Sequence, residues 1–381
     1  MPVFTVLRFR HKKKTGLFSA SKSEVIHMHM ADALLAPAVA ATMYVASGAV
    51  AGVSVHKLKK EDEDSKKLPV MAVTAALVFA GQMINYTIPG TGSSGHMCGG
   101  MLLTGLLGPQ AGFLSMIVIL AIQCLFFGDG GLLALGANVW NMAFYGCFVG
   151  YYLIWRPIMR SKWFGKMAPK AAQRARIITA SILGCVITLQ LGAFSVVCET
   201  SLSGITELPF GTFCGIMQPI HLAIGLIEGL VTAAVLTFVH EARPELIKDA
   251  SVSSETADRM SIKKLIAVLA VVVIVVGGGL SLFASSNPDG LEWSLFGNSD
   301  AGYSQNMGLD EDNYGVSSSA ADSAAKIQEK TAFLPDYSFA DSDSAAGTSV
   351  SGLVGSAMVA AVAVGVCALC GIFRKNHKAK Q

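Results

Sequence analysis

The sequence has few charged residues. Asp, Glu, Lys and Arg make up 14% of its 381 residues, whereas hydrophobic residues make up 52%. Soluble globular domains carry roughly 25% charged residues. The low content of charge and the long apolar runs therefore exclude an ordinary soluble domain and indicate an integral membrane protein.

Several patterns that define enzyme classes are also missing. The sequence has no G-x-x-x-x-G-K-[ST], so we expect no ATP site of that kind in this chain. It has no H-E-x-x-H either, because the run that begins at His240 has Pro244 in place of the second histidine. There is no Ser–His–Asp pattern and no inverted repeat of broken helices. These absences argue against an ATPase, a zincin-type membrane protease and a serine hydrolase, so we expect a membrane protein without enzymatic activity and without a nucleic-acid partner.

The eight cysteines are scattered and lie mostly within apolar runs, so they form no disulfide framework. Cys367 and Cys370 form a CxxC pattern inside an apolar helical segment. We interpret them as packing residues.

Nine apolar segments are candidates for membrane-spanning helices, which need about 20 residues each. The third segment is short and follows a glycine-rich loop, which is typical of a half-helix or a tilted piece. The nine segments are 31–55, 69–87, 98–108, 110–127, 132–155, 177–197, 214–240, 263–285 and 351–373.

The positive charges predict the orientation. Five lysines follow the first segment, seven Lys or Arg lie within 156–176, and the last residues are also basic. With nine spans and Met28 outside, every basic cluster falls in the cytoplasm, as the positive-inside rule requires. We therefore expect a multi-pass protein of the cell inner membrane, with a cytoplasmic C-terminus and an acidic extracytoplasmic loop at 286–350.

The fold predicted is an all-α integral membrane bundle of seven spans, followed by a two-span hairpin. We divide the chain into a basic extension, the seven-span unit, a cytoplasmic linker, a two-span unit and a cytoplasmic tail. Their ranges are 1–27, 28–240, 241–262, 263–373 and 374–381. The outer loop 286–350 of the hairpin is rich in Ser, Ala, Gly and Asp, so we expect much of it to be mobile. Its acidic residues could attract cations, or it could be a solvated spacer.

Three histidines gather at the predicted outer face. His29 lies at the start of the first span, His96 lies in a loop rich in Gly and Ser, and His221 lies in the seventh span. Non-helical backbone is tolerated at membrane depth only where it is buried in protein or lines a cavity. Each histidine alone could be a packing residue, but His29 and His96 together favour a metal-binding role.

Other polar residues are candidates for the surroundings or the pathway of a metal: Asn85, Asp129, Asn138 and Glu228. A glutamate inside a span is costly and suggests a function. Glu228 shares a helix face with His221, seven residues earlier, and could also tie helices together. Two other classes of function remain open: a metal-dependent intramembrane enzyme using His221, Glu228 and His96, and a cation carrier that acts alone.

Four motifs carry a family resemblance. They are "MHMADALLAP" (Met28–Pro37), "GQMINYTIPGTGSSGHMCGGMLLTGLLGP" (Gly81–Pro109), "FFGDGGLLALGANVWNM" (Phe126–Met142) and "HLAIGLIEGLVTAAVL" (His221–Leu236). In order and spacing they resemble the substrate-binding (S) component of energy-coupling-factor transporters for nickel and cobalt, over about residues 28–240. The motif "NPDGLEWSLFG" (Asn287–Gly297) resembles the two-span accessory subunit of the nickel branch. The chain thus looks like a fusion of the two, which favours nickel over cobalt.

The resemblance implies a metal site. Its ligands would be the terminal amine of Met28, the backbone nitrogen and imidazole of His29, and the imidazole of His96. Four nitrogens in a plane suit Ni(II) and Cu(II), and binding should weaken in acid because the ligands must lose protons. The resemblance also implies a transmembrane coupling subunit and cytoplasmic ATPase subunits as partners. The amine must be free, so we expect translation to start at Met28 or residues 1–27 to be removed; otherwise the site is disabled.

Overall fold

The computed structural model describes residues 29–60, 68–250, 260–302, 306–310, 314–339 and 346–378. Side chains are described within these ranges, except for Lys60, Leu68 and residues 366–378. Met28, the predicted extension 1–27 and the CxxC side chains therefore lie outside what the structure describes.

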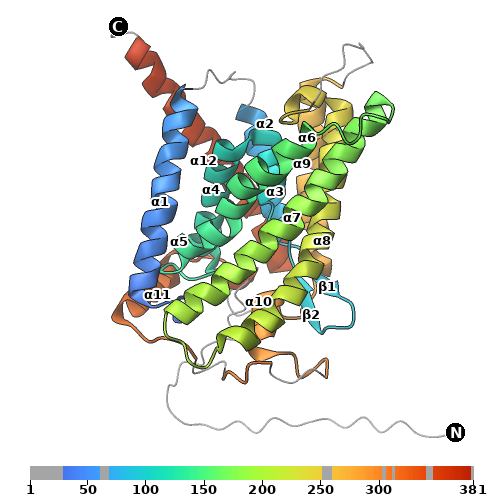
Figure 1. Cartoon of the computed structure of the whole chain (residues 1–381). Coiled ribbons are helices and arrows are strands. Elements are labelled where there is room, and N and C mark those ends of the chain that lie inside the picture. Colours follow the sequence, from blue (N-terminus) through green and yellow to red (C-terminus); the bar gives the residue numbers. More distant parts are fainter. Residues whose placement is uncertain are drawn as a thin grey trace, which may run out of the picture.

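The protein is a bundle of helices (Figure 1). Helices occur at every one of the nine predicted segments. They are α1 (Pro37–Lys60), α2 (Leu68–Gln82), α3 (Gly100–Leu107), α4 (Pro109–Phe127), the continuous α5 (Leu135–Asn138), η3 (Val139–Trp155) and α6 (Arg156–Met159), then α7 (Pro169–Leu202), α8 (Phe210–Ala242), the continuous α9 (Ile262–Ile274), η5 (Val275–Gly279) and η6 (Leu280–Phe283), and α12 (Ala346–Lys378). This confirms an all-α, multi-pass membrane protein.

Six helices among the described residues are long and apolar enough to cross a membrane. They are α1, α4, α7, α8, the helix Ile262–Phe283, and α12 over Ala346–Gly365. The predicted second span ends earlier than expected, at Gln82, because the chain then turns into a β-hairpin. The third is an eight-residue helix buried along its whole length. The count of nine spans thus stays a prediction.

Close backbone contacts place α3 in the middle of the bundle. Gly100 at its first position faces Gly146 of η3, and a Cβ added to Gly146 would lie 2.9 Å from the Cα of Gly100. Real Cβ atoms do not approach other atoms so closely, so the two glycines allow the helices to touch. Because Gly99, which precedes α3, has a φ of +85°, the glycine-rich loop enters this buried helix through a conformation that suits glycine.

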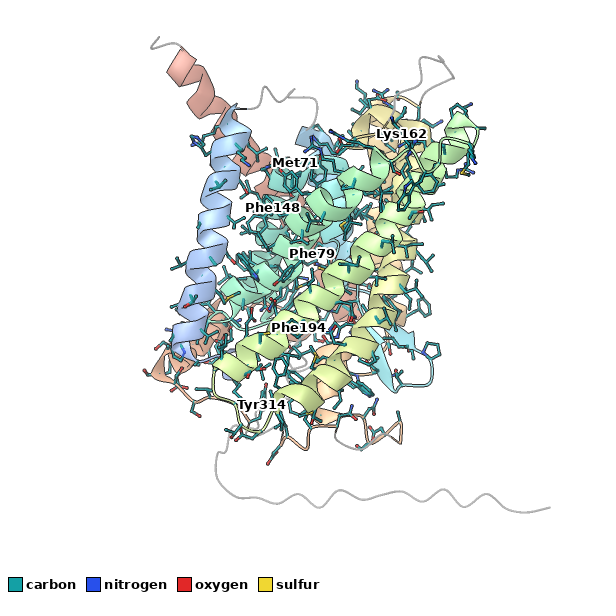
Figure 2. All side chains as sticks on the ribbon, in the orientation of Figure 1. Met71, Phe79, Phe148, Lys162, Phe194 and Tyr314 are labelled. Carbon is teal, nitrogen blue, oxygen red and sulfur yellow. The ribbon has the colours of Figure 1, made fainter. Side chains whose placement is uncertain are left out.

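The surface and the interior of the bundle differ as expected for a protein in lipid. Phe79 is fully buried, whereas Phe194 of α7 is 41% exposed. Figure 2 shows both side chains at mid-height, between Lys162 at one end of the bundle and Tyr314 at the other. Large apolar side chains on α7 and α8 are similarly exposed, including Leu183, Leu222 and Leu230. Hydrocarbon chains are the solvent that such a surface favours.

The end of the bundle opposite α6 and the last turns of α12 carries small elements, and we call it the hairpin end (Figure 1). A two-stranded antiparallel hairpin there consists of β1 (Tyr86–Ile88) and β2 (Ser93–Gly95). Three helical elements of the second unit lie at the same end: α10 (Gly290–Phe296), which contacts β2, and α11 (Ser319–Thr331) and η7 (Pro335–Tyr337), which contact α4 on another side of the bundle.

The described residues of loop 286–350 contain folded elements, whereas the expectation that much of this loop is mobile stays a prediction. Asp289 and Ser318 cap α10 and α11 through their side chains. Leu291 and Leu295, one helical turn apart, are buried against the hairpin end of the first unit. The polar composition of the loop concealed these few apolar positions.

Candidate metal-binding site

His29 lies just before the helical turn η1 (Asp32–Leu34) that leads into α1, and it is 5% exposed. Its Nδ1 is 2.9 Å from Oδ1 of Asp129, which follows the end of α4. Burial opposes a charge on His29, but the neighbouring carboxylate outweighs burial and raises its pKa. Burial alone would raise the pKa of Asp129, yet the charge of His29 and two hydrogen bonds lower it. The two side chains therefore form a buried ion pair.

The segment beside His29 is held by the motif that ends α4. Gly130 and Gly131 allow close approach, because a Cβ on Gly130 would lie 2.7 Å from the Cβ of His29. Asn138 of α5 pairs with both backbone groups of Met30. Its Oδ1 accepts from the Met30 N–H at 3.1 Å, and its Nδ2 donates to the Met30 carbonyl at 3.1 Å. Residues of the "FFGDGGLLALGANVWNM" motif thus hold the segment around His29 and Met30 in a fixed position.

His96 follows β2, and its ring centroid lies 5.6 Å from that of His29. Its Nδ1 contacts the carbonyl of Met97 at 3.2 Å. The loop after it is fixed by Glu228 of α8, whose carboxylate accepts from the backbone N–H of Cys98 at 2.8 Å and of Gly99 at 2.9 Å. Two histidines that are far apart in the sequence therefore meet at the hairpin end of the bundle.

Both histidines face a cavity of about 110 Å³. A single water needs only about 10–15 Å³ of such space, so the cavity has room for an ion. The polar side chains that line it are those of His29, His96, Cys98, Asn138, Asn141, Thr188, His221 and Asp289. Among the described residues, no hydrogen-bond partner exists for the buried Nε2 of His29.

The predicted site residues differ in whether they line the cavity. His29, His96, Asn138 and His221 line the cavity, and Asp129 contacts His29 from behind. Glu228 does not line it.

Asn85 lies between α2 and β1, where its carbonyl accepts a hydrogen bond from the backbone N–H of Ser285 at 2.7 Å, and it is not part of the cavity wall. Met28 is outside the described residues.

Two residues that contact the site were not singled out from the sequence. Asp289 belongs to the "NPDGLEWSLFG" motif, so the motif itself was the signal. Tyr337, whose phenol donates a 2.5 Å hydrogen bond to Asp129, lies in no recognisable pattern.

Within the described ranges, no group of three or more His, Cys, Asp and Glu side chains is arranged to hold a metal ion. A metal in this cavity would therefore need a ligand of another kind besides the two imidazoles.

Comparisons with known proteins agree with this architecture. The family model CbiM, described as the cobalt uptake substrate-specific transmembrane region, matches residues 29–246, and the PDGLE domain matches residues 263–371. The "Putative fused nickel transport protein NikMN" of Archaeoglobus fulgidus is 34% identical over 339 residues, which cover 88% of this chain and 96% of that protein.

A second relative is the "Probable fused nickel transport protein LarMN" of Lactiplantibacillus plantarum. It is 33% identical over 70% of this chain and 78% of its own length. A crystal structure of a truncated transition metal transporter is 31% identical over 56% of this chain and 98% of that chain, with a TM-score of 0.47.

The matches confirm the resemblance drawn from the five motifs. The chain belongs to the CbiM family of cobalt uptake substrate-specific transmembrane proteins, and its C-terminal part is a PDGLE domain.

Proposed function

We propose that this chain is the substrate-specific component of an energy-coupling-factor importer and captures Ni²⁺ at its outer face. The observation that carries the proposal is the meeting of His29 and His96 in a buried cavity of a CbiM-family protein. The relatives that match most of this chain are named nickel transport proteins, which supports nickel over cobalt as the cargo.

The ligands we propose are the amine of Met28, the backbone nitrogen and one ring nitrogen of His29, and a ring nitrogen of His96. Met28 directly precedes His29, so its amine would be in reach if Met28 begins the working protein. Only Nδ1 can close a small chelate ring with the backbone nitrogen of His29, so the ring would turn over and present Nε2 to Asp129. A carboxylate behind a metal-binding histidine fixes the orientation of the ring and raises its basicity.

Delivery needs partners, because the sequence lacks a phosphate-binding loop for ATP. A transmembrane coupling subunit and cytoplasmic ATPase subunits would drive release of the ion to the inside. The basic segment around Lys162 lies at the end of the bundle opposite the cavity (Figure 2). If that end is cytoplasmic, as the positive-inside rule favours, the cavity opens outward.

The structure gives less support to an intramembrane enzyme. Glu228, the acid–base candidate in that alternative, uses its carboxylate to bind the backbone at Cys98 and Gly99. A general base must reach the reacting group, and this carboxylate is not in the cavity wall.

Reconstitution in liposomes tests the proposed function. We expect uptake of ⁶³Ni²⁺ only when the chain is combined with its coupling and ATPase subunits and ATP. Uptake by the chain alone would show a carrier instead. Loss of uptake in His96→Ala, with normal assembly of the complex, would link transport to the cavity.

A further inference from the structure

The PDGLE domain approaches the two histidines at two places, one of which is in the cavity wall and the other behind it. Asp289 lies beside His96, and Tyr337 holds the carboxylate of Asp129 that contacts His29. Both residues belong to the second unit of the chain, whereas both histidines belong to the first.

Asp289 divides its two oxygens between two tasks. Oδ1 accepts hydrogen bonds from the backbone N–H of Leu291 at 2.9 Å and of Glu292 at 2.8 Å, which caps α10. Oδ2 lies 3.8 Å from Nε2 of His96. This distance is too long for a hydrogen bond, so Asp289 can act on His96, and on a cation bound beside it, only electrostatically. Asp289 is 3% exposed and lines the cavity.

The chain around Asp289 is fastened to the hairpin that precedes His96. The backbone N–H of Ser94 donates to the carbonyl of Pro288 at 2.8 Å, and its hydroxyl donates to the carbonyl of Asn287 at 2.8 Å. Farther along, Nδ2 of Asn298 donates to the carbonyl of Gly92 at 2.7 Å. These bonds fix Asp289 relative to the loop that carries His96.

Tyr337 acts on the other histidine. Its phenol donates to Oδ2 of Asp129 at 2.5 Å, and its ring stacks on Phe127 with centroids 5.0 Å apart. On the same side, Gln328 of α11 donates to the carbonyl of Gly130 at 2.8 Å. The loop that presents Asp129 to His29 is therefore held from outside by the PDGLE domain.

We propose that Asp289 and Tyr337 are positioning residues through which the PDGLE domain prepares the cavity for a divalent cation. The inference rests on the proposed function. A Ni²⁺ ion bound by one deprotonated amide and neutral nitrogens keeps one positive charge, which is costly to bury unless a counter-charge lies nearby. Asp289 supplies that charge on the His96 side. Tyr337 holds Asp129 in the orientation that fixes the ring of His29.

Asp289→Asn separates the two tasks of the residue. Asparagine caps helices as well as aspartate does, so the variant keeps α10 and removes only the charge. We expect its Ni²⁺ affinity to fall about 10- to 100-fold, the usual effect of losing an outer partner of a metal ligand, while the melting temperature of the metal-free protein stays unchanged. Tyr337→Phe keeps the stacked ring and should weaken Ni²⁺ binding to a similar degree.

The measurement is Ni²⁺ titration, by calorimetry, of the form of the chain that begins at Met28 and runs through the PDGLE domain, together with the visible absorption of the bound ion. The matched controls are Asp300→Asn, an exposed carboxyl in the same outer segment, and Tyr152→Phe at the far end of the bundle. Both should bind as the unmodified protein does. Weaker binding with an altered absorption band in Asp289→Asn or Tyr337→Phe supports the positioning role.

Two outcomes would overturn the reasoning, and they can be distinguished. If the unmodified protein binds Ni²⁺ but Asp289→Asn and Tyr337→Phe bind equally well, the PDGLE domain does not position the site and Asp289 is only a helix cap. If the form that begins at Met28 binds neither Ni²⁺ nor Co²⁺ even without these substitutions, the proposed function itself fails.

Discussion

Replacing Glu228 by alanine should destabilise the loop that presents His96. The carboxylate is 1% exposed and accepts hydrogen bonds from two backbone N–H groups, those of Cys98 and Gly99. Each buried donor left without an acceptor costs about 1–3 kcal/mol, so the loss of both should cost about 2–6 kcal/mol. Glu228→Gln keeps one carbonyl oxygen and should cost about half as much.

Thermal unfolding in detergent, followed by tryptophan fluorescence, should therefore rank the melting temperatures as unmodified protein, Glu228→Gln and Glu228→Ala in descending order. Glu241→Ala is the control, because Glu241 is in an exposed ion pair with Arg174, and such a pair contributes at most about 1 kcal/mol. The Ni²⁺ affinities should follow the same order, since His96 precedes Cys98 by two residues. Equal melting temperatures of the Glu228→Ala and Glu241→Ala proteins would refute this account of the loop.

Two further substitutions test the hairpin end of the bundle. A Cβ on Gly290 would lie 2.9 Å from Cδ1 of Ile224, so Gly290→Ala should displace α10, weaken Ni²⁺ binding and cost about 1–3 kcal/mol of stability. The control is Gly279→Ala, whose added Cβ meets nothing within 4 Å and which should have none of these effects. Equal melting temperatures and Ni²⁺ affinities of the two variants would contradict the packing described for α10. Burial and the charge of Asp129 raise the pKa of Asp336 to about 7. The folded protein thus favours the neutral acid, and this stabilisation is complete below the ordinary value of 3.8 and is lost as the pH rises towards 7. The melting temperature of Asp336→Asn relative to the unmodified protein should therefore rise as the pH increases from about 4 to about 7. A difference in melting temperature that does not change with pH would show that the carboxyl of Asp336 is not buried in the folded protein.

Much of the fold could be predicted because long apolar runs determine spanning helices locally. Helices α4 and α8, for example, begin and end within four residues of the predicted segments. The end of α2 could not be predicted, because the β-hairpin that replaces its last turn is stabilised by contacts with distant residues such as Asn298. The helices described within loop 286–350 could not be predicted for a similar reason: the composition is polar, and the apolar side chains that pack α10 against the first unit, such as Leu291 and Leu295, are few.

The site was only partly predictable. The motifs indicated His29 and His96, and the structure brings the two together. The sequence left two roles open for Glu228, and its hydrogen bonds to the backbone favour the structural one. Tyr337 contacts Asp129 across 208 residues of sequence. No local pattern reports a contact of that kind, which depends on how the second unit folds back over the first.

The most direct test of the account is the stoichiometry of Ni²⁺ bound to the purified protein in two forms, one beginning at Met1 and one at Met28, each also as His96→Ala. The account predicts one Ni²⁺ per chain only for the form that begins at Met28, with the yellow, diamagnetic signature of a square-planar ion, and loss of that signature in His96→Ala. Equal binding by both forms would contradict it, because the amine of Met28 would then not be a ligand and the site would have to consist of side chains such as those of His29, His96 and His221.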